Sequence, residues 1–258
     1  MEIQLKGGRA LNDPSYARIA YENKLTATTT TGAEALLIPN TWERWALADG
    51  SVTLLLQTTA ASTINYIAMA AHNLFTAGTT RINIQVSTTV GSGWFTVCDQ
   101  SIISNAPIFC SLDDYLNIVE VRITFTGGTS REIGVVYAGE SLIMQRGLFS
   151  GHNPINLSSM TEYRNAMSDS GQFLGRRIKR KGQQSSFAWA NLTDDWYREY
   201  FQPFVVSAKT TPFFIQWRPD YQPLECAFGY TTADISPSNQ GGTTRMMSVN
   251  FTMRAHDE

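Results

Sequence analysis

The stretch IVEVRITF, residues 118–125, decides the fold class, because apolar residues at 119, 121, 123 and 125 alternate with polar ones. The stretch RINIQVS, residues 81–87, repeats this alternation. A period of two indicates a strand with one face in a core and the other toward solvent or a neighbour. Residues 64–71 and 133–137 are more continuously apolar, as expected for central strands covered on both faces. Turns rich in Gly, Ser and Thr separate these stretches, so we predict an antiparallel β-sandwich.

The composition indicates a folded chain with little charge. Of its 258 residues, 43% are hydrophobic and 11% aromatic, but only 16% are charged, against roughly a quarter in an ordinary soluble domain. The aromatic content excludes disorder for most of the chain. The net charge of −2 gives no global attraction to nucleic acid or to an anionic membrane. Residues 1–11 do not resemble a secretory signal, and the longest apolar run, 66–71, is too short to span a membrane, so we expect a soluble protein made in the cytoplasm.

Glycines and a proline between residues 146 and 154 interrupt the pattern, and we place a domain boundary there. Residues 1–145 contain 8 basic and 12 acidic residues, net −4, whereas residues 146–258 contain 12 basic and 10 acidic residues, net +2. The second domain is predicted to have strands and one helix. Residues 172–181 and 184–189 are predicted to form a hairpin, and Thr193 to be the N-cap of a helix that Pro203 kinks or ends.

Catalytic chemistry has little support in the sequence. The three histidines, His72, His152 and His256, are not at metal-ligand spacing. We expect His72 to be hydrogen-bonded at a strand end and His152 to bond to backbone in a turn. We expect His256 to be solvated. No nucleophile motif or phosphate-binding loop is present. We therefore expect a protein that is not an enzyme, with no catalytic residue, no cofactor and no metal. The three cysteines are expected to be buried free thiols.

A basic run is the sharpest local feature. Five of the chain's 20 cations fall within six positions: Arg176, Arg177, Lys179, Arg180 and Lys181. On a strand, residues 177, 179 and 181 lie on one side and 176, 178 and 180 on the other. Two interpretations stay open: an edge strand that its charges protect against pairing, or a contact with an acidic neighbour or a polyanion.

Two tryptophans are candidates for carbohydrate contact. Trp42 and Trp45 lie in the segment NTWERW, residues 40–45. An exposed indole can stack on a sugar face, whereas a buried one fills a core. The core interpretation is favoured, but the local sequence does not decide between the two.

The C-terminal domain resembles the minor tail proteins that form the tail-tip ring of long-tailed bacteriophages, which are similar to tail-tube subunits. The matching pieces are the predicted hairpin over 174–189, the helix from Thr193, PFFIQWRP at 212–219 with Tyr221 and Pro223, the strand through Cys226 and the final strand 246–254. This resemblance implies a tube-like β-barrel or split-sheet domain over 146–258.

The N-terminal half resembles galactose-binding, or discoidin-type, jelly rolls. The resemblance rests on residues 64–74, 82–87 with the turn that ends at Trp94, and 118–125. It implies a galactose-binding-like sandwich over 1–145, without a sugar signature that carries over residue by residue.

Together the two resemblances imply a structural protein of the phage tail tip. It would form a ring, hexameric in this family, that joins the tail tube to the central hub and lets DNA pass without specific binding. The basic run would then face an acidic neighbouring subunit or the lumen; the neighbour is favoured, because a cationic lumen would hold back the DNA. The jelly roll would stiffen contacts or touch host-surface glycans. The alternative function is a carbohydrate-binding or host-adhesion module of the tail tip.

Overall fold

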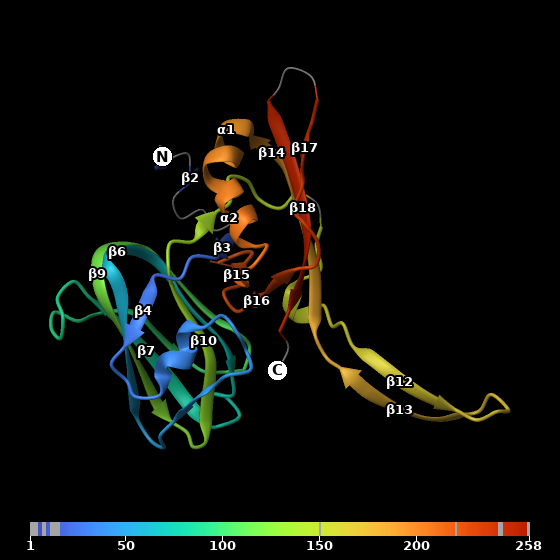
Figure 1. Ribbon diagram of the computed structural model, residues 1–258, viewed down its shortest axis with the longest axis horizontal. Helices are drawn as coiled ribbons and strands as arrows, with labels where there is room; N and C mark the ends of the chain where they lie inside the picture. The colour runs from blue at the N-terminus through green and yellow to red at the C-terminus, as the bar shows by residue number, and fades with distance from the viewer. Residues whose placement is uncertain are drawn as a thin grey trace.

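A seven-stranded antiparallel sheet forms the N-terminal part of the computed structural model, which describes residues 5–6, 9–10, 16–149, 151–219, 221–241 and 245–256. Its strands are β4 (Leu25–Thr28), β5 (Trp45–Leu47), β6 (Val52–His72), β7 (Thr79–Ser87), β8 (Phe95–Ser101), β9 (Ile108–Gly127) and β10 (Arg131–Gly139). The order is β5-β10-β6-β9-β7-β8, with β4 beside β6. The sheet curls around its own apolar core (Figure 1). The prediction of a mainly β chain with antiparallel sheets is confirmed.

The alternating pattern that decided the fold class lies on β9. Residues 121, 123 and 125 are fully buried, and residues 122 and 124 between them are half-buried. β6 and β10 are buried on both faces, as their continuous apolar sequence predicted: residues 64–72 and 133–139 are all buried.

A second seven-stranded sheet forms the other half of the molecule. Its strands are β3 (Arg18–Ala20), β11 (Leu142–Ile143), β14 (Gln183–Thr193), β15 (Phe213–Gln216), β16 (Cys226–Thr231), β17 (Pro237–Asn239) and β18 (Met246–Ala255). The order is β11-β3-β15-β16-β18-β14, with β17 also on β18. β3 pairs with both β11 and β15. The chain therefore contributes β3 to this sheet, then forms the first sheet, and returns to this sheet with β11. The division between the sheets therefore does not coincide with residues 145/146.

The remaining elements are short. They are β1 (Leu5–Lys6), β2 (Arg9–Ala10), the 3-10 helices η1 (Ala33–Leu37) and η2 (Ile155–Leu157), and a helical segment made of α1 (Asp194–Trp196), the π-helix η3 (Tyr197–Phe201) and α2 (Gln202–Ser207). No helix in the described ranges is long and apolar enough to cross a membrane.

The helical segment tolerates Pro203 through its π-turn. A proline inside an α-helix removes one backbone donor and crowds the preceding turn. Here it occupies the first turn of α2, directly after η3, so the helix continues to Ser207. Thr193 is the N-cap residue by position, but its side chain makes no capping bond. Its hydroxyl instead accepts a hydrogen bond from Gln145 Nε2 at 3.0 Å.

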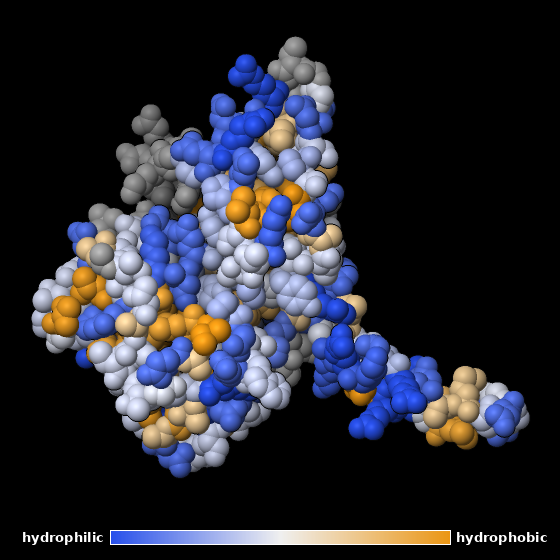
Figure 2. All heavy atoms as spheres, viewed as in Figure 1, coloured by the Kyte–Doolittle hydropathy of each residue, from blue (hydrophilic) through white to orange (hydrophobic). Residues whose placement is uncertain are grey.

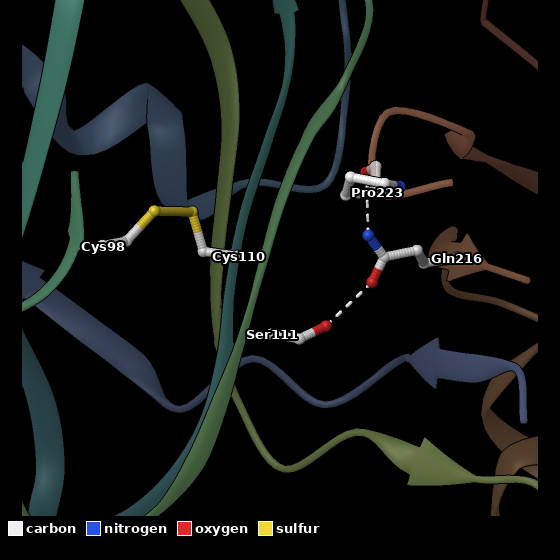
Figure 3. The surroundings of a disulfide bond; sticks show 5 residues. All are labelled: Cys98, Cys110, Ser111, Gln216 and Pro223. Atoms are coloured by element: carbon white, nitrogen blue, oxygen red, sulfur yellow. Dashed lines mark hydrogen bonds between the residues drawn. A yellow bond between two sulfur atoms is a disulfide. The ribbon is translucent and has the colours of Figure 1, made fainter. Parts of the chain in front are cut away.

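An aromatic cluster joins the two sheets. Tyr66, Phe109 and Tyr137 of the first sheet pack with Phe214 and Phe228 of the second. At its margin Ser111 Oγ donates to Gln216 Oε1 at 2.8 Å, and Gln216 Nε2 donates to the Pro223 carbonyl at 2.8 Å (Figure 3). The apolar faces of β6 and β10 that do not face the first core are thus covered by the second sheet.

The expectation of three free thiols is wrong. Cys98 on β8 and Cys110 on β9 form a disulfide (Figure 3), with their Cα atoms 6.5 Å apart. The curl of the sheet brings the two strands together, although β8 pairs with β7 in the hydrogen-bonded order. Cys226 is free and buried, and burial raises the pKa of its thiol to about 12.

Candidate functional sites: an exposed arm and the groove at its base

The basic run lies on a two-stranded arm that projects from the second sheet (Figure 1). The arm consists of β12 (Glu162–Met167) and β13 (Phe173–Arg180), paired antiparallel. The predicted hairpin between residues 172–181 and 184–189 is therefore wrong, because β14 pairs with β18 instead. Gly182 is buried where the chain turns from the arm into β14, and the backbone N–H of Met160 donates to its carbonyl at 2.7 Å.

Arg176 and Lys179 contact different residues of β12, but the predicted alternation does not hold at the end of the run, where a register shift lets both Lys179 and Arg180 reach Glu162. On one face Arg176 donates to Asn165 Oδ1 at 2.8 Å and stacks over the Tyr163 ring at 4.6 Å. On the other face Lys179 Nζ lies 2.6 Å from Glu162 Oε1. The Lys179 ammonium lowers the pKa of the Glu162 carboxyl.

One cross-strand pair of like charges destabilises the arm. Arg164 on β12 lies directly opposite Arg177 on β13. Like charges in this position destabilise a strand pair, and a two-stranded sheet alone is marginally stable in water. Within the described part of the chain neither guanidinium has a carboxylate partner. This face therefore suits an acidic surface.

Three exposed apolar residues lie beside the polar turn at the far end of the arm. Met167, Phe173 and Leu174 are each more than 60% exposed. Figure 2 shows hydrophilic residues over the base and middle of the arm and a hydrophobic group near its far end. Exposed apolar side chains that gather at the tip of a projection are typical of a contact with another molecule.

A groove of about 530 Å³ lies at the base of the arm. It brings together both groups of residues that the sequence had singled out: Trp42, and Arg180 with Lys181. The pairing of β16 with β18 adds Tyr230 and Arg254, which are direct cross-strand neighbours. The remaining lining residues are Pro39, Asn40, Thr41, Gly182, Pro212, Phe228, Gly229, Ala255 and His256.

A tight turn holds Trp42 at the groove. Asn40 Oδ1 accepts hydrogen bonds from the backbone N–H of Trp42 at 3.1 Å and of Glu43 at 2.9 Å. Such hydrogen bonds from a side chain to the backbone that follows it stabilise a turn and fix the direction in which the chain leaves it. Trp42 is 91% exposed, the largest exposed fraction among the described large hydrophobic residues. Trp45, three residues later on β5, is only 7% exposed and packs in the core of the first sheet, so its ring is not available to a ligand.

The three histidines have different surroundings. His72 is fully buried, and burial lowers its pKa to about 4, so it is neutral at neutral pH. His152, expected to bond to backbone in a turn, instead packs edge-on against Trp217 with ring centroids 4.4 Å apart. His256, expected to be solvated, is half-buried and lines the groove. Among the described residues, no three His, Cys, Asp or Glu side chains gather as metal ligands.

Sequence reasoning missed Tyr230 and Arg254. Tyr230 follows the buried residues of β16 and is 50% exposed, so an aromatic residue at the end of an apolar run was the available signal. Arg254 is part of the alternating final strand and is half-buried, with Nη2 3.2 Å from Met160 Sδ. No motif connects these two residues to Trp42, because only the packing of the two sheets brings them together.

Comparison with known proteins finds structural similarity over only part of the chain. No protein-family model matches, and no curated protein matches at a significant level. A chitosan-binding module of a chitosanase/glucanase from Paenibacillus sp. IK-5 has a TM-score of 0.40 and 18% identity, over 47% of this chain and 98% of the module. A pectin-binding carbohydrate-binding module has a TM-score of 0.39 and 14% identity, over 46% and 93%. An F5/8 type C domain from Bacteroides fragilis has a TM-score of 0.36 and 11% identity, over 52% and 97%. These values transfer no ligand to this chain.

Proposed function

We propose that this protein binds carbohydrate in the groove at the base of the arm. The observation that carries the proposal is the position of Trp42, whose indole is almost wholly exposed at a groove of ligand size. A ring held out by a turn offers an apolar face on which the C–H face of a sugar can stack. Tyr230 supplies a second aromatic surface at the same groove. The protein would act as a binding module and not as an enzyme.

Replacing Trp42 with alanine should abolish most of this binding. We expect affinity for a bound oligosaccharide to fall at least tenfold, which corresponds to about 1.4 kcal/mol. The melting temperature should not change, because the side chain is 91% exposed. Screening the wild-type protein on a glycan array, followed by calorimetry with the best ligand, measures both quantities.

A matched control is Phe149→Ala, which removes an exposed aromatic ring outside the groove. This variant should bind like the wild type. Undiminished binding by Trp42→Ala, or no glycan binding by the wild-type protein on the array, would refute the proposal.

We propose as a second candidate function that the chain is a structural subunit of a phage tail tip. The arm favours this candidate, because its like-charged face and its exposed apolar residues both suit contact with a neighbouring subunit. The subunits would form a ring, hexameric in the family it resembles, between tail-tube and hub proteins. DNA would pass through the lumen without specific binding. Assembly would follow synthesis in the host cytoplasm.

The double substitution Arg177→Glu with Lys179→Glu tests this candidate. Ring formation or stacking should be lost, because a cationic contact face becomes anionic. The melting temperature should change little, because Lys179→Glu removes an exposed ion pair with Glu162 that adds little to stability, and Arg177→Glu places a carboxylate opposite Arg164. Sedimentation velocity and electron microscopy of the assembled particles measure the outcome. Normal assembly would mean that the basic run is a solvent-exposed strand and not a contact face.

A further inference from the structure

The charged side chains that line the groove all have the same sign. Among the described residues of its lining, these are Arg180, Lys181 and Arg254, and no carboxylate is present. They come from separate parts of the chain: the end of β13, the turn after it and β18. The fold therefore assembles a cationic groove that no single stretch of sequence encodes.

The acidic residues beside the groove already have partners. Glu162 lies 2.6 Å from Lys179, which is outside the groove, and 4.0 Å from Arg180. Glu43 accepts a hydrogen bond from Asn40 Nδ2 at 3.3 Å within the turn that carries Trp42. Lys179, and not a residue of the groove lining, therefore provides the closer neutralisation of Glu162. Arg180 and Arg254 also lower the pKa of the Glu162 carboxyl, after Lys179, so Glu162 offsets part of their charge and the groove keeps a net positive charge.

We infer that the ligand of the groove is an anionic glycan, a saccharide that carries carboxylate or phosphate groups. This inference rests on the proposed carbohydrate binding. A sugar ring stacked on Trp42 would be placed in the same groove as two guanidinium groups and one ammonium group. Guanidinium groups bind carboxylate and phosphate oxygens through paired N–H donors, and such charge-assisted bonds are about twice as strong as neutral ones.

A neutral saccharide would leave this charge without a counterpart. Binding would bury part of the three cations against hydroxyl groups, and desolvating a charge without a partner is unfavourable. The arrangement thus selects for acidic sugars and against their neutral counterparts. The Trp42 ring distinguishes this groove from a purely electrostatic polyanion site.

The test measures the affinity of the full chain by calorimetry for tetragalacturonate and for its methyl ester, which keeps the rings but removes the charge. A phosphorylated oligomannoside and its dephosphorylated form give the corresponding pair for phosphate. In at least one pair the anionic member should bind at least tenfold more tightly in 50 mM salt, and the preference should shrink at 300 mM salt. The pair that shows the preference identifies the acidic group.

Variants separate the two contributions. Arg180→Gln with Lys181→Gln should lower affinity for the anionic member at least tenfold and leave affinity for the neutral member within twofold. Trp42→Ala should lower both. The matched control, Arg164→Gln with Arg177→Gln, removes two cations of the arm that lie outside the groove and should change neither affinity.

The outcomes distinguish the inference from the function on which it rests. Equal binding of charged and neutral members would overturn the anionic preference while the carbohydrate function stands. Failure of all four saccharides to bind would overturn the inference, and if the glycan array were also negative the function would fall with it. Tight binding of a single-stranded DNA oligomer that needs Arg180 and Lys181 but not Trp42 would overturn the inference in favour of nucleic acid.

Discussion

Replacing Phe214 with alanine is expected to destabilise the protein by about 3–5 kcal/mol, the usual cost of emptying a buried phenylalanine site. Phe214 lies on β15, is fully buried and belongs to the cluster that joins the two sheets. Its ring centroid lies 4.6 Å from that of Phe228 and 5.4 Å from that of Tyr137. Because the neighbouring rings belong to both sheets, neither sheet can fill the space without moving relative to the other.

Urea denaturation followed by tryptophan fluorescence measures this loss. Phe173→Ala is the matched control, since the same ring is removed from the arm, where it is 64% exposed. The control should change the free energy of unfolding by less than about 0.5 kcal/mol. Equal effects of the two substitutions would mean that the aromatic cluster does not hold the sheets together.

The class of the fold could be predicted because its signal is local. Alternation along residues 118–125 and continuous apolar sequence at 64–71 depend only on which faces are covered, and the structure covers those faces. The pairing partner of a strand could not be predicted in the same way, because it is not a local property of the sequence. Residues 172–181 are flanked by two segments able to pair with them, and alternation does not choose between Glu162–Met167 and Gln184–Trp189.

The disulfide had no sequence signal either. Cys98 and Cys110 are 12 residues apart, which matches no metal or redox motif. Only the curl that brings β8 close to the start of β9 makes a bond possible. A count of three cysteines in an ordinary-sized domain favoured free thiols, and the geometry of the sheet decided otherwise.

Only part of the candidate site could be recognised in the sequence. Trp42 and Trp45 have similar surroundings in sequence, yet one is 91% and the other 7% exposed, because the Asn40 turn ends before β5 begins. The basic run was recognisable from its density of charge. That Arg180 and Lys181 share a groove with Trp42 depends on how the two sheets pack, and a single sequence carries no pattern for that contact.

Gly229→Ala should be as damaging as the loss of Phe214, with an expected destabilisation of about 3 kcal/mol or more. Gly229 lies on β16, opposite Ala255 of β18. A β-carbon at this position would lie 2.0 Å from the carbonyl oxygen of Arg254 and 2.7 Å from the Cα of Ala255. Both obstacles are backbone atoms, so no side-chain rotation relieves the overlap and the two strands must separate.

Gly151→Ala provides the matched control, because a β-carbon there meets no atom within 4 Å. Its free energy of unfolding should stay within about 0.5 kcal/mol of the wild type. Separation of β16 from β18 would also displace Tyr230 from Arg254, its cross-strand neighbour in the groove. Any Gly229→Ala protein that still folds should therefore bind glycan less tightly even with Trp42 intact. Wild-type stability in this variant would contradict the close contact of these strands, and weakened stability with full glycan affinity would show that the groove does not depend on their pairing.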